Sequence, residues 1–267
     1  MFDMFALFIL GLIIGSFLNV LVFRRGSKAI TGRSACLSCG ALIRWYDNVP
    51  VLSYLIVRGR CRSCGSRISV QYIVVEILTG ALFAAVGVET LSRSVPLTAL
   101  SLIAVALLVA ISVYDLRHTI IPDEWVYVFC GVAIASIFLA PVQQLPLALL
   151  AGPFAALPLF VLWLVSRGRW MGFGDVKLAL GIGWLLGPLY GIVAVFFAFV
   201  IGAVISVAIL LSLPSIVGFL RKRGIARFRA GGAAFTMKSE VPFGPFLIAS
   251  CFILWILLIY QIPLPMV

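Results

Sequence analysis

The sequence is dominated by a succession of long apolar runs. Hydrophobic residues make up 63% of the 267 residues and charged residues only 11%, a balance that ordinary soluble domains do not have. A bilayer core of about 30 Å requires a helix of roughly 17 to 25 apolar residues. We therefore expect an all-α polytopic membrane protein. Its hydropathy pattern predicts spans at residues 4–23, 70–88, 96–114, 125–140, 145–165, 176–186, 188–213 and 244–260.

The distribution of positive charge decides how often the chain crosses. Residues 176–213 fit either one long tilted crossing or two helices broken at Gly187 and Pro188. With two crossings, 19 of the 20 Lys and Arg residues lie on one side of the membrane, and Arg93 alone lies on the other. Cytoplasmic loops carry such an excess of positive charge. We therefore predict about eight transmembrane helices with both termini outside, and we attribute the net charge of +11 to topology and not to nucleic-acid binding.

Four cysteines lie in the predicted cytoplasmic loop 24–69, which is long enough to form a small subdomain. They form two C-x2-C pairs, Cys36 with Cys39 and Cys61 with Cys64, and a Gly follows each pair. Four thiolates with this spacing suit a tetrahedral zinc ion, and a closed four-ligand site is structural. We expect the basic residues at 60, 62 and 67 to offset the negative charge of the site. The alternative is that the pairs are redox-active or idle.

Two aspartates are predicted at the same cytoplasmic edge of the bundle. Asp115 ends the third predicted span, and Asp175 follows Gly172 and Gly174 at the start of the sixth. An Asp at the start of a helix is often only an N-cap, and this remains an alternative for Asp175. For Asp115 the helix C-terminus is the unfavourable end for a negative charge.

A pair of adjacent carboxyl groups suits aspartic proteolysis. When two carboxyls lie close together they do not both ionise, so one keeps a proton and the other remains a base. The base then deprotonates a water that attacks a peptide carbonyl, and the protonated partner polarises that carbonyl. The sequence therefore predicts a membrane aspartic endopeptidase with Asp115 and Asp175 as its catalytic pair.

The motifs around these residues resemble those of a known family. The segment Gly172-Phe-Gly-Asp175 resembles the G-x-G-D signature of membrane aspartyl proteases, and Asp115 with Asp123, preceded by Ile-Pro, resembles the D-x7-D motif of type IV prepilin peptidases. Further motifs resemble the amino-terminal domain of the bifunctional members: Gly15-Ser-Phe-Leu-Asn-Val20 with Arg24, the paired cysteines, Tyr46-Asp-Asn-Val-Pro50, Arg58-Gly-Arg60-Cys61-Arg62 and Glu76-Ile-Leu-Thr-Gly80. The first cysteine pair departs from the family pattern, which often has Pro after the first Cys.

The resemblance implies a bacterial inner-membrane enzyme whose active site faces the cytoplasm. Such an enzyme removes the basic leader of type IV prepilins or type II secretion pseudopilins. The bifunctional members then methylate the new amino terminus with S-adenosylmethionine. Residues 1–95 would form the methyltransferase part and residues 96–267 the peptidase part. Asn19 and Glu76, polar groups within apolar spans, are candidates for a cofactor pocket, or are packing residues satisfied by a neighbouring helix.

Two other functions fit parts of the pattern. A proton-coupled transporter also uses paired acids within a helix bundle, although transporter sites usually lie near the bilayer midplane. A zinc-binding membrane scaffold without enzymatic activity would need the cysteines and not the aspartates. In all these cases the basic loop 214–242 is expected to lie on anionic lipid head groups.

Overall fold

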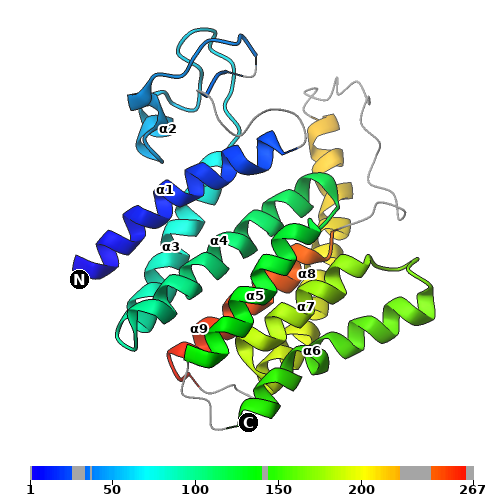
Figure 1. The fold of residues 1–267 in the computed structure, drawn as a ribbon. Helices are drawn as coiled ribbons and strands as arrows, with labels where there is room; N and C mark the ends of the chain where they lie inside the picture. The colour runs from blue at the N-terminus through cyan, green and yellow to red at the C-terminus, as the bar shows by residue number, and fades with distance from the viewer. Residues whose placement is uncertain (1, 26–33, 37, 140–143, 223–241, 263–267) are drawn as a thin grey trace.

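A computed structural model of the chain describes residues 2–25, 34–36, 38–139, 144–222 and 242–262 (Figure 1). Within these residues the regular secondary structure is helical, apart from two isolated β-bridges. The long helices are α1 (Phe2–Arg24), α3 (Gln71–Leu91), α4 (Val95–His118), α5 (Asp123–Leu139), α6 (Leu145–Ser166), α7 (Phe173–Leu186), α8 (Pro188–Lys222) and α9 (Gly244–Ile259). The first loop adds the short elements η1 (Trp45–Asn48) and α2 (Leu52–Ile56).

Five of these helices are long and apolar enough to cross a membrane: α1, α3, α4, α6 and the Pro188–Ala208 part of α8. The helix α9 is a shorter apolar helix. The chain is therefore a multi-pass membrane protein. Each predicted span corresponds to one helix, although α5 and α7 do not reach the length of the five long candidates.

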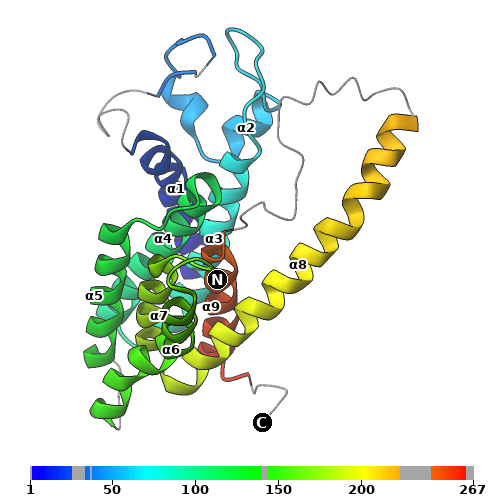
Figure 2. The ribbon, with the colours of Figure 1, turned by 90° about the vertical axis from the view of Figure 1, so that its right-hand side faces the viewer.

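The predicted break near residue 187 is present in the structure. Gly187 has φ +83, a conformation that glycine adopts readily, and Pro188 begins α8. Beyond the turn, a Cβ placed on Gly191 would lie 2.9 Å from the Cα of Gly183, so α8 folds back against α7. The helix then continues to Lys222, past the predicted end at 213, and leans away from the bundle (Figure 2). Most of the basic segment predicted to contact lipid, residues 223–241, lies outside the described residues.

Glycines bring α1 and α3 into close contact. A Cβ placed on Gly11 would lie 2.7 Å from the Cα of Gly80, and one on Gly15 would lie 2.9 Å from the Cα of Glu76. Within a bilayer, helices associate through close packing because lipid is as apolar as their side chains. Small residues on facing helices therefore hold this pair together.

Helix α4 lies at the centre of the bundle. It contacts α1, α3, α5 and α9, and its residues Leu108 and Ile111 are completely buried. Because its last turn carries Asp115, that carboxyl group is held by a helix that packs against four others.

A larger side chain at the α1–α3 contact should destabilise the protein. We expect Gly11→Val to lower the free energy of unfolding by about 1–3 kcal/mol, the usual cost of overpacking. The matched control is Gly131→Val on α5, where an added Cβ meets nothing within 4 Å. Thermal unfolding in detergent gives the melting temperature of each variant. Equal melting temperatures would contradict the glycine-mediated contact.

Candidate active site and metal centre

Asp115 lies in the last turn of α4 and is 4% exposed. The C-terminus of its own helix is unfavourable for a negative charge, but the N-terminus of α9 compensates for it. The backbone amide of Gly244, the first residue of α9, interacts with the Asp115 carboxylate. A Cβ placed on Gly244 would lie 2.6 Å from Oδ2 of Asp115. Glycine at this position therefore allows the helix N-terminus to approach the carboxylate.

Asp175 lies in the first turn of α7 and is 7% exposed. The N-cap of this helix is Gly172 and not Asp175, and the cap makes no side-chain hydrogen bond. The Oδ1 atom of Asp175 is buried and has no hydrogen-bond partner among the described residues. The charge of Asp115 acts on Asp175. The end of α4 and the start of α7 thus bring the two predicted carboxyl groups within electrostatic reach of each other.

Ile121 packs against the starts of α7 and α9 beside this pair. A Cβ placed on Gly174 would lie 2.9 Å from the Cβ of Ile121, and one on Gly244 would lie 3.2 Å from its Cδ1. Gly174 therefore allows α7 to approach the α4–α5 connection. Gly172 has no comparably close neighbour, since the nearest atom to its added Cβ would be 3.9 Å away.

Lys177, one turn after the start of α7, forms an ion pair with Asp123 at the start of α5. Its ammonium group also lies 5.4 Å from the ring centre of Tyr127 and 5.6 Å from that of Phe173. The side chain of Lys177 is only 14% exposed. This contact holds the starts of α5 and α7 together. His118 is exposed and lies against the ring of Tyr114.

Arg25 makes contacts beside the acidic pair that the sequence does not predict. Its Nη2 forms an ion pair with Oε2 of Glu124 at 2.7 Å, and its guanidinium carbon lies 4.6 Å from the ring centre of Trp125 and 5.2 Å from that of Tyr114. Tyr114 directly precedes Asp115. Arg25 therefore ties the end of α1 to the helix ends around the acidic pair. Arg25 is about 90 to 100 residues away from these partners, so no local sequence pattern predicts the contact.

The four loop cysteines form a cluster with metal-site geometry. Their sulfur atoms all lie within 4.8 Å of one another, and Cys36 and Cys64 are 3.9 Å apart. A tetrahedral zinc ion with Zn–S bonds of about 2.3 Å separates its sulfurs by about 3.8 Å. The cluster is therefore the right size for a metal ion.

Each cysteine pair is built as the same tight turn. The amide of Gly40 donates to the carbonyl of Cys36 at 2.9 Å, and the amide of Gly65 donates to that of Cys61 at 2.9 Å. Both glycines have positive φ, +70 and +71. The Gly that follows each cysteine pair in the sequence therefore closes its turn.

Hydrogen bonds in and beside the turns lower the pKa of two of the cysteines. The backbone amide of Cys39 and the hydroxyl of Ser66 lower the pKa of Cys36 to about 6. The Ser66 hydroxyl lowers the pKa of Cys64 as well. The backbone amide of Ala41 acts in the same direction on Cys39, but the thiols of Cys64 and Cys36 outweigh it and raise the pKa of Cys39 to about 11. A bound cation would relieve this competition between neighbouring sulfurs.

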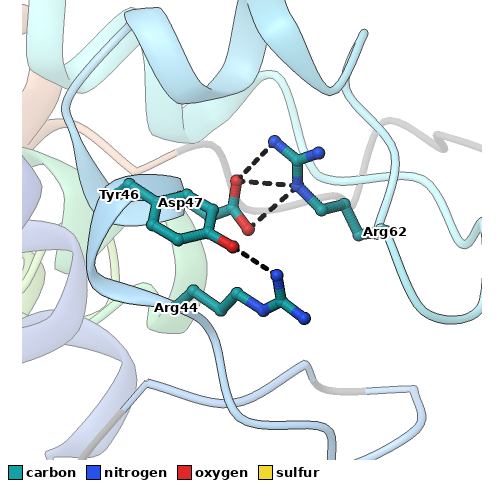
Figure 3. A network of polar contacts seen from close by, with 4 residues as sticks. All are labelled: Arg44, Tyr46, Asp47 and Arg62. Carbon is teal, nitrogen blue, oxygen red and sulfur yellow. Dashed lines mark hydrogen bonds and ion pairs between the residues drawn. The ribbon is translucent and has the colours of Figure 1, made fainter.

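An ion-pair network joins the second cysteine turn to η1 (Figure 3). Arg62 contacts Asp47 through two nitrogens, with Nε to Oδ1 at 2.9 Å and Nη2 to Oδ1 at 2.8 Å. Arg44 donates to the hydroxyl of Tyr46, and both guanidinium groups lie near the Tyr46 ring. The charge of Arg62, which the sequence predicts to offset the thiolates, is thus paired with Asp47.

Asn19 and Glu76 are both buried at the α1–α3 contact. The Nδ2 of Asn19 donates to the carbonyls of Gly15 at 3.3 Å and Tyr72 at 3.2 Å, while its Oδ1 has no partner among the described residues. The Oε2 of Glu76 accepts from the backbone amide of Val51 at 2.8 Å. Glu76 therefore fastens the cysteine subdomain to α3.

Comparisons with known proteins identify the family of the chain. Residues 9–90 match the model of the bacterial Peptidase A24 N-terminal domain, and residues 102–207 match that of the type IV leader peptidase family. The chain belongs to the type IV leader peptidase family. The first match contains the cysteines, Asn19 and Glu76, and the second contains both aspartates.

Several relatives are named prepilin leader peptidase/N-methyltransferase. That of Myxococcus xanthus is 35% identical over 77% of this chain and 63% of its own length. That of Bacillus subtilis is 33% identical over 77% of this chain and 83% of its own length. That of Vibrio cholerae is 32% identical over 67% of this chain and 76% of its own length. No solved structure matches the chain.

Loss of one cysteine should release the metal from this leader peptidase family member. We expect Cys61→Ser to lower the metal content of the purified protein at least tenfold and to expose residues 34–69 to protease, because a structural site with three thiolates is incomplete. Elemental mass spectrometry and limited proteolysis measure the two effects. Cys130→Ser on α5, outside the cluster, is the control. Equal metal content in both variants would contradict the assignment.

Proposed function

We propose that this protein cleaves the leader peptide of type IV prepilins or related pseudopilins and methylates the amino terminus that cleavage exposes. The observation that carries the proposal is the juxtaposition of Asp115 and Asp175, two buried acids from different helices that interact electrostatically. The names of the relatives support the substrate and both activities.

The geometry supports a shared-proton mechanism for the two carboxyl groups. The helix N-terminus at Gly244 favours a negative charge on Asp115, so Asp115 serves as the base that deprotonates water. Asp175, whose Oδ1 has no partner among the described residues, holds the proton and donates it toward the scissile carbonyl and then the leaving amine. The substrate peptide enters at the end of the bundle where α4 ends and α7 begins.

The proposed topology has eight transmembrane helices, with the acidic pair and the cysteine subdomain at the cytoplasmic face of the bacterial inner membrane. The bias of Lys and Arg toward that side supports this orientation. A location at helix ends also favours hydrolysis over transport, for which a site near the midplane is usual. In this assignment residues 96–267 form the peptidase part and residues 1–95 the methyltransferase part.

Zinc is the metal we assign to Cys36, Cys39, Cys61 and Cys64. The four sulfur donors and their separations fit it. The ion cross-links two turns that the surrounding loop alone holds together weakly, and it takes no part in cleavage.

S-adenosylmethionine is the methyl donor that the second activity requires. Glu76 accepts from the amide of Val51 and Asn19 donates to the carbonyl of Tyr72 on α3, and these bonds favour the packing role over the predicted role in a cofactor pocket. The buried Oδ1 of Asn19 is the one atom of the pair whose partner is missing in the described part of the chain. We therefore assign Glu76 a structural role and attribute no step of methyl transfer to either residue.

Replacing either catalytic acid should abolish cleavage. We expect Asp115→Asn and Asp175→Asn each to lower the rate by a factor of about 100 to 10,000, the usual contribution of a general acid or base. Mass spectrometry of a prepilin amino terminus, after incubation with enzyme and S-adenosylmethionine, reports leader loss and added methyl together. Asp3→Asn, at the other end of the bundle, is the control. Near-wild-type cleavage by either Asn variant, at equal protein level, would refute the dyad.

The two glycines before Asp175 should differ in their tolerance of a side chain. We expect Gly174→Ala to lower cleavage at least tenfold, because its Cβ would lie 2.9 Å from the Cβ of Ile121 and displace the start of α7. Gly172→Ala should stay within about threefold of wild type, since its Cβ meets no neighbour closer than 3.9 Å. The same prepilin assay measures both. Equal losses would show that contact with Ile121 does not position Asp175.

A further inference from the structure

A cavity of about 480 Å³ lies at the end of the bundle opposite to the acidic pair. Its walls come from the last turns of α3, α5, α7 and α9 and the first turns of α4 and α6. The lining includes Leu97, Leu147, Trp184 and Trp255. A volume between about 300 and 1,000 Å³ is typical of sites for small organic ligands.

Most of the residues that line this cavity are apolar. Its hydroxyl groups include those of Thr90 and Ser136, which donate to carbonyls of their own helices, Thr90 to Val86 at 2.9 Å and Ser136 to Ala133 at 2.7 Å. These hydroxyls are already satisfied and do not require a polar ligand. The cavity therefore suits a hydrocarbon chain.

A single arginine gives the cavity a charged rim. Arg93 lines it, is exposed, and donates one hydrogen bond from Nη2 to the carbonyl of Ile259 at 3.1 Å. The part of the chain that the structure describes offers it no ion-pair partner. Two acids belong to this end of the bundle, Asp3 at the start of α1 and Glu89 near the end of α3, but neither lines the cavity. A guanidinium group retains several donors for an anion when one is used.

We propose that this cavity binds one anionic phospholipid, with an acyl chain between the helices and the phosphate on Arg93. The chain spans a membrane, so lipid is the amphiphile present at this end. An arginine that reaches the interface from an apolar site has the geometry that a lipid phosphate requires. This proposal is independent of the proposed peptidase activity.

Selective loss of anionic lipid tests the site. Delipidated protein is incubated with phosphatidylglycerol or with phosphatidylcholine of the same acyl chains, and bound lipid is counted by native mass spectrometry. We expect wild type to retain one phosphatidylglycerol in preference to phosphatidylcholine. Arg93→Gln should lower that preference about fivefold, the loss expected for one cation near the membrane surface. Arg58→Gln, an exposed cation of the cysteine subdomain, should leave it unchanged.

Filling the cavity tests the position of the acyl chain. Ser136→Trp projects into the cavity and should reduce retention of both lipids, whereas Ala135→Trp, on the exposed face of the same helix, should not. A lipid with a photoreactive acyl chain should label residues 97–104 or 132–137. Equal preference in wild type and Arg93→Gln would overturn the proposal, as would labelling confined to other segments. Equal preference would mean that Arg93 only donates to the carbonyl of Ile259.

Discussion

The cost of burying two carboxyl groups side by side governs the arrangement of this fold. Asp115 and Asp175 are both almost fully enclosed, and burial penalises ionised acids strongly. The N-terminus of α9 reduces the penalty for Asp115 by presenting the amide of Gly244, and the first turn of α7 brings Asp175 close to it. Each approach depends on a glycine, at 244 and 174, that leaves room for a carboxylate or for Ile121. The acids supply the chemistry, and the glycines allow the acids to meet.

The cations near the acidic pair form ion pairs with other acids. Lys177 is paired with Asp123 and Arg25 with Glu124, and none of the ion pairs in the described residues includes Asp115 or Asp175. A cation bonded directly to the pair would stabilise both carboxylates in their ionised form, and the protonated partner would be lost. The nearby acids at 123 and 124 thus hold two positive charges away from the pair while tying helix ends together.

The sequence predicts those parts of the structure that depend on local pattern. The helices follow from hydropathy, the break at Gly187 and Pro188 from the distribution of Lys and Arg, and the cysteine turns from spacing. Contacts between distant segments leave no such pattern. The role of Gly244 at Asp115 and the position of Arg25 between Tyr114 and Trp125 arise only when helices pack. The charge of Arg62 was likewise assigned to the thiolates, because Asp47 lies in a separate turn whose proximity the spacing does not reveal.

The buried carboxyl group of Glu76 on α3 is explained by its bond to the cysteine subdomain. Val51 has φ +61, an unfavourable conformation for a β-branched residue, and its amide donates to the buried carboxylate of Glu76. A strained residue persists where its surroundings fix it, and here a charge-assisted hydrogen bond does so. The cysteine subdomain is therefore fastened to α3, which glycines hold against α1. Since Arg25 at the end of α1 contacts the helix ends beside Asp115, the metal centre and the acidic pair are joined through a continuous set of packed elements.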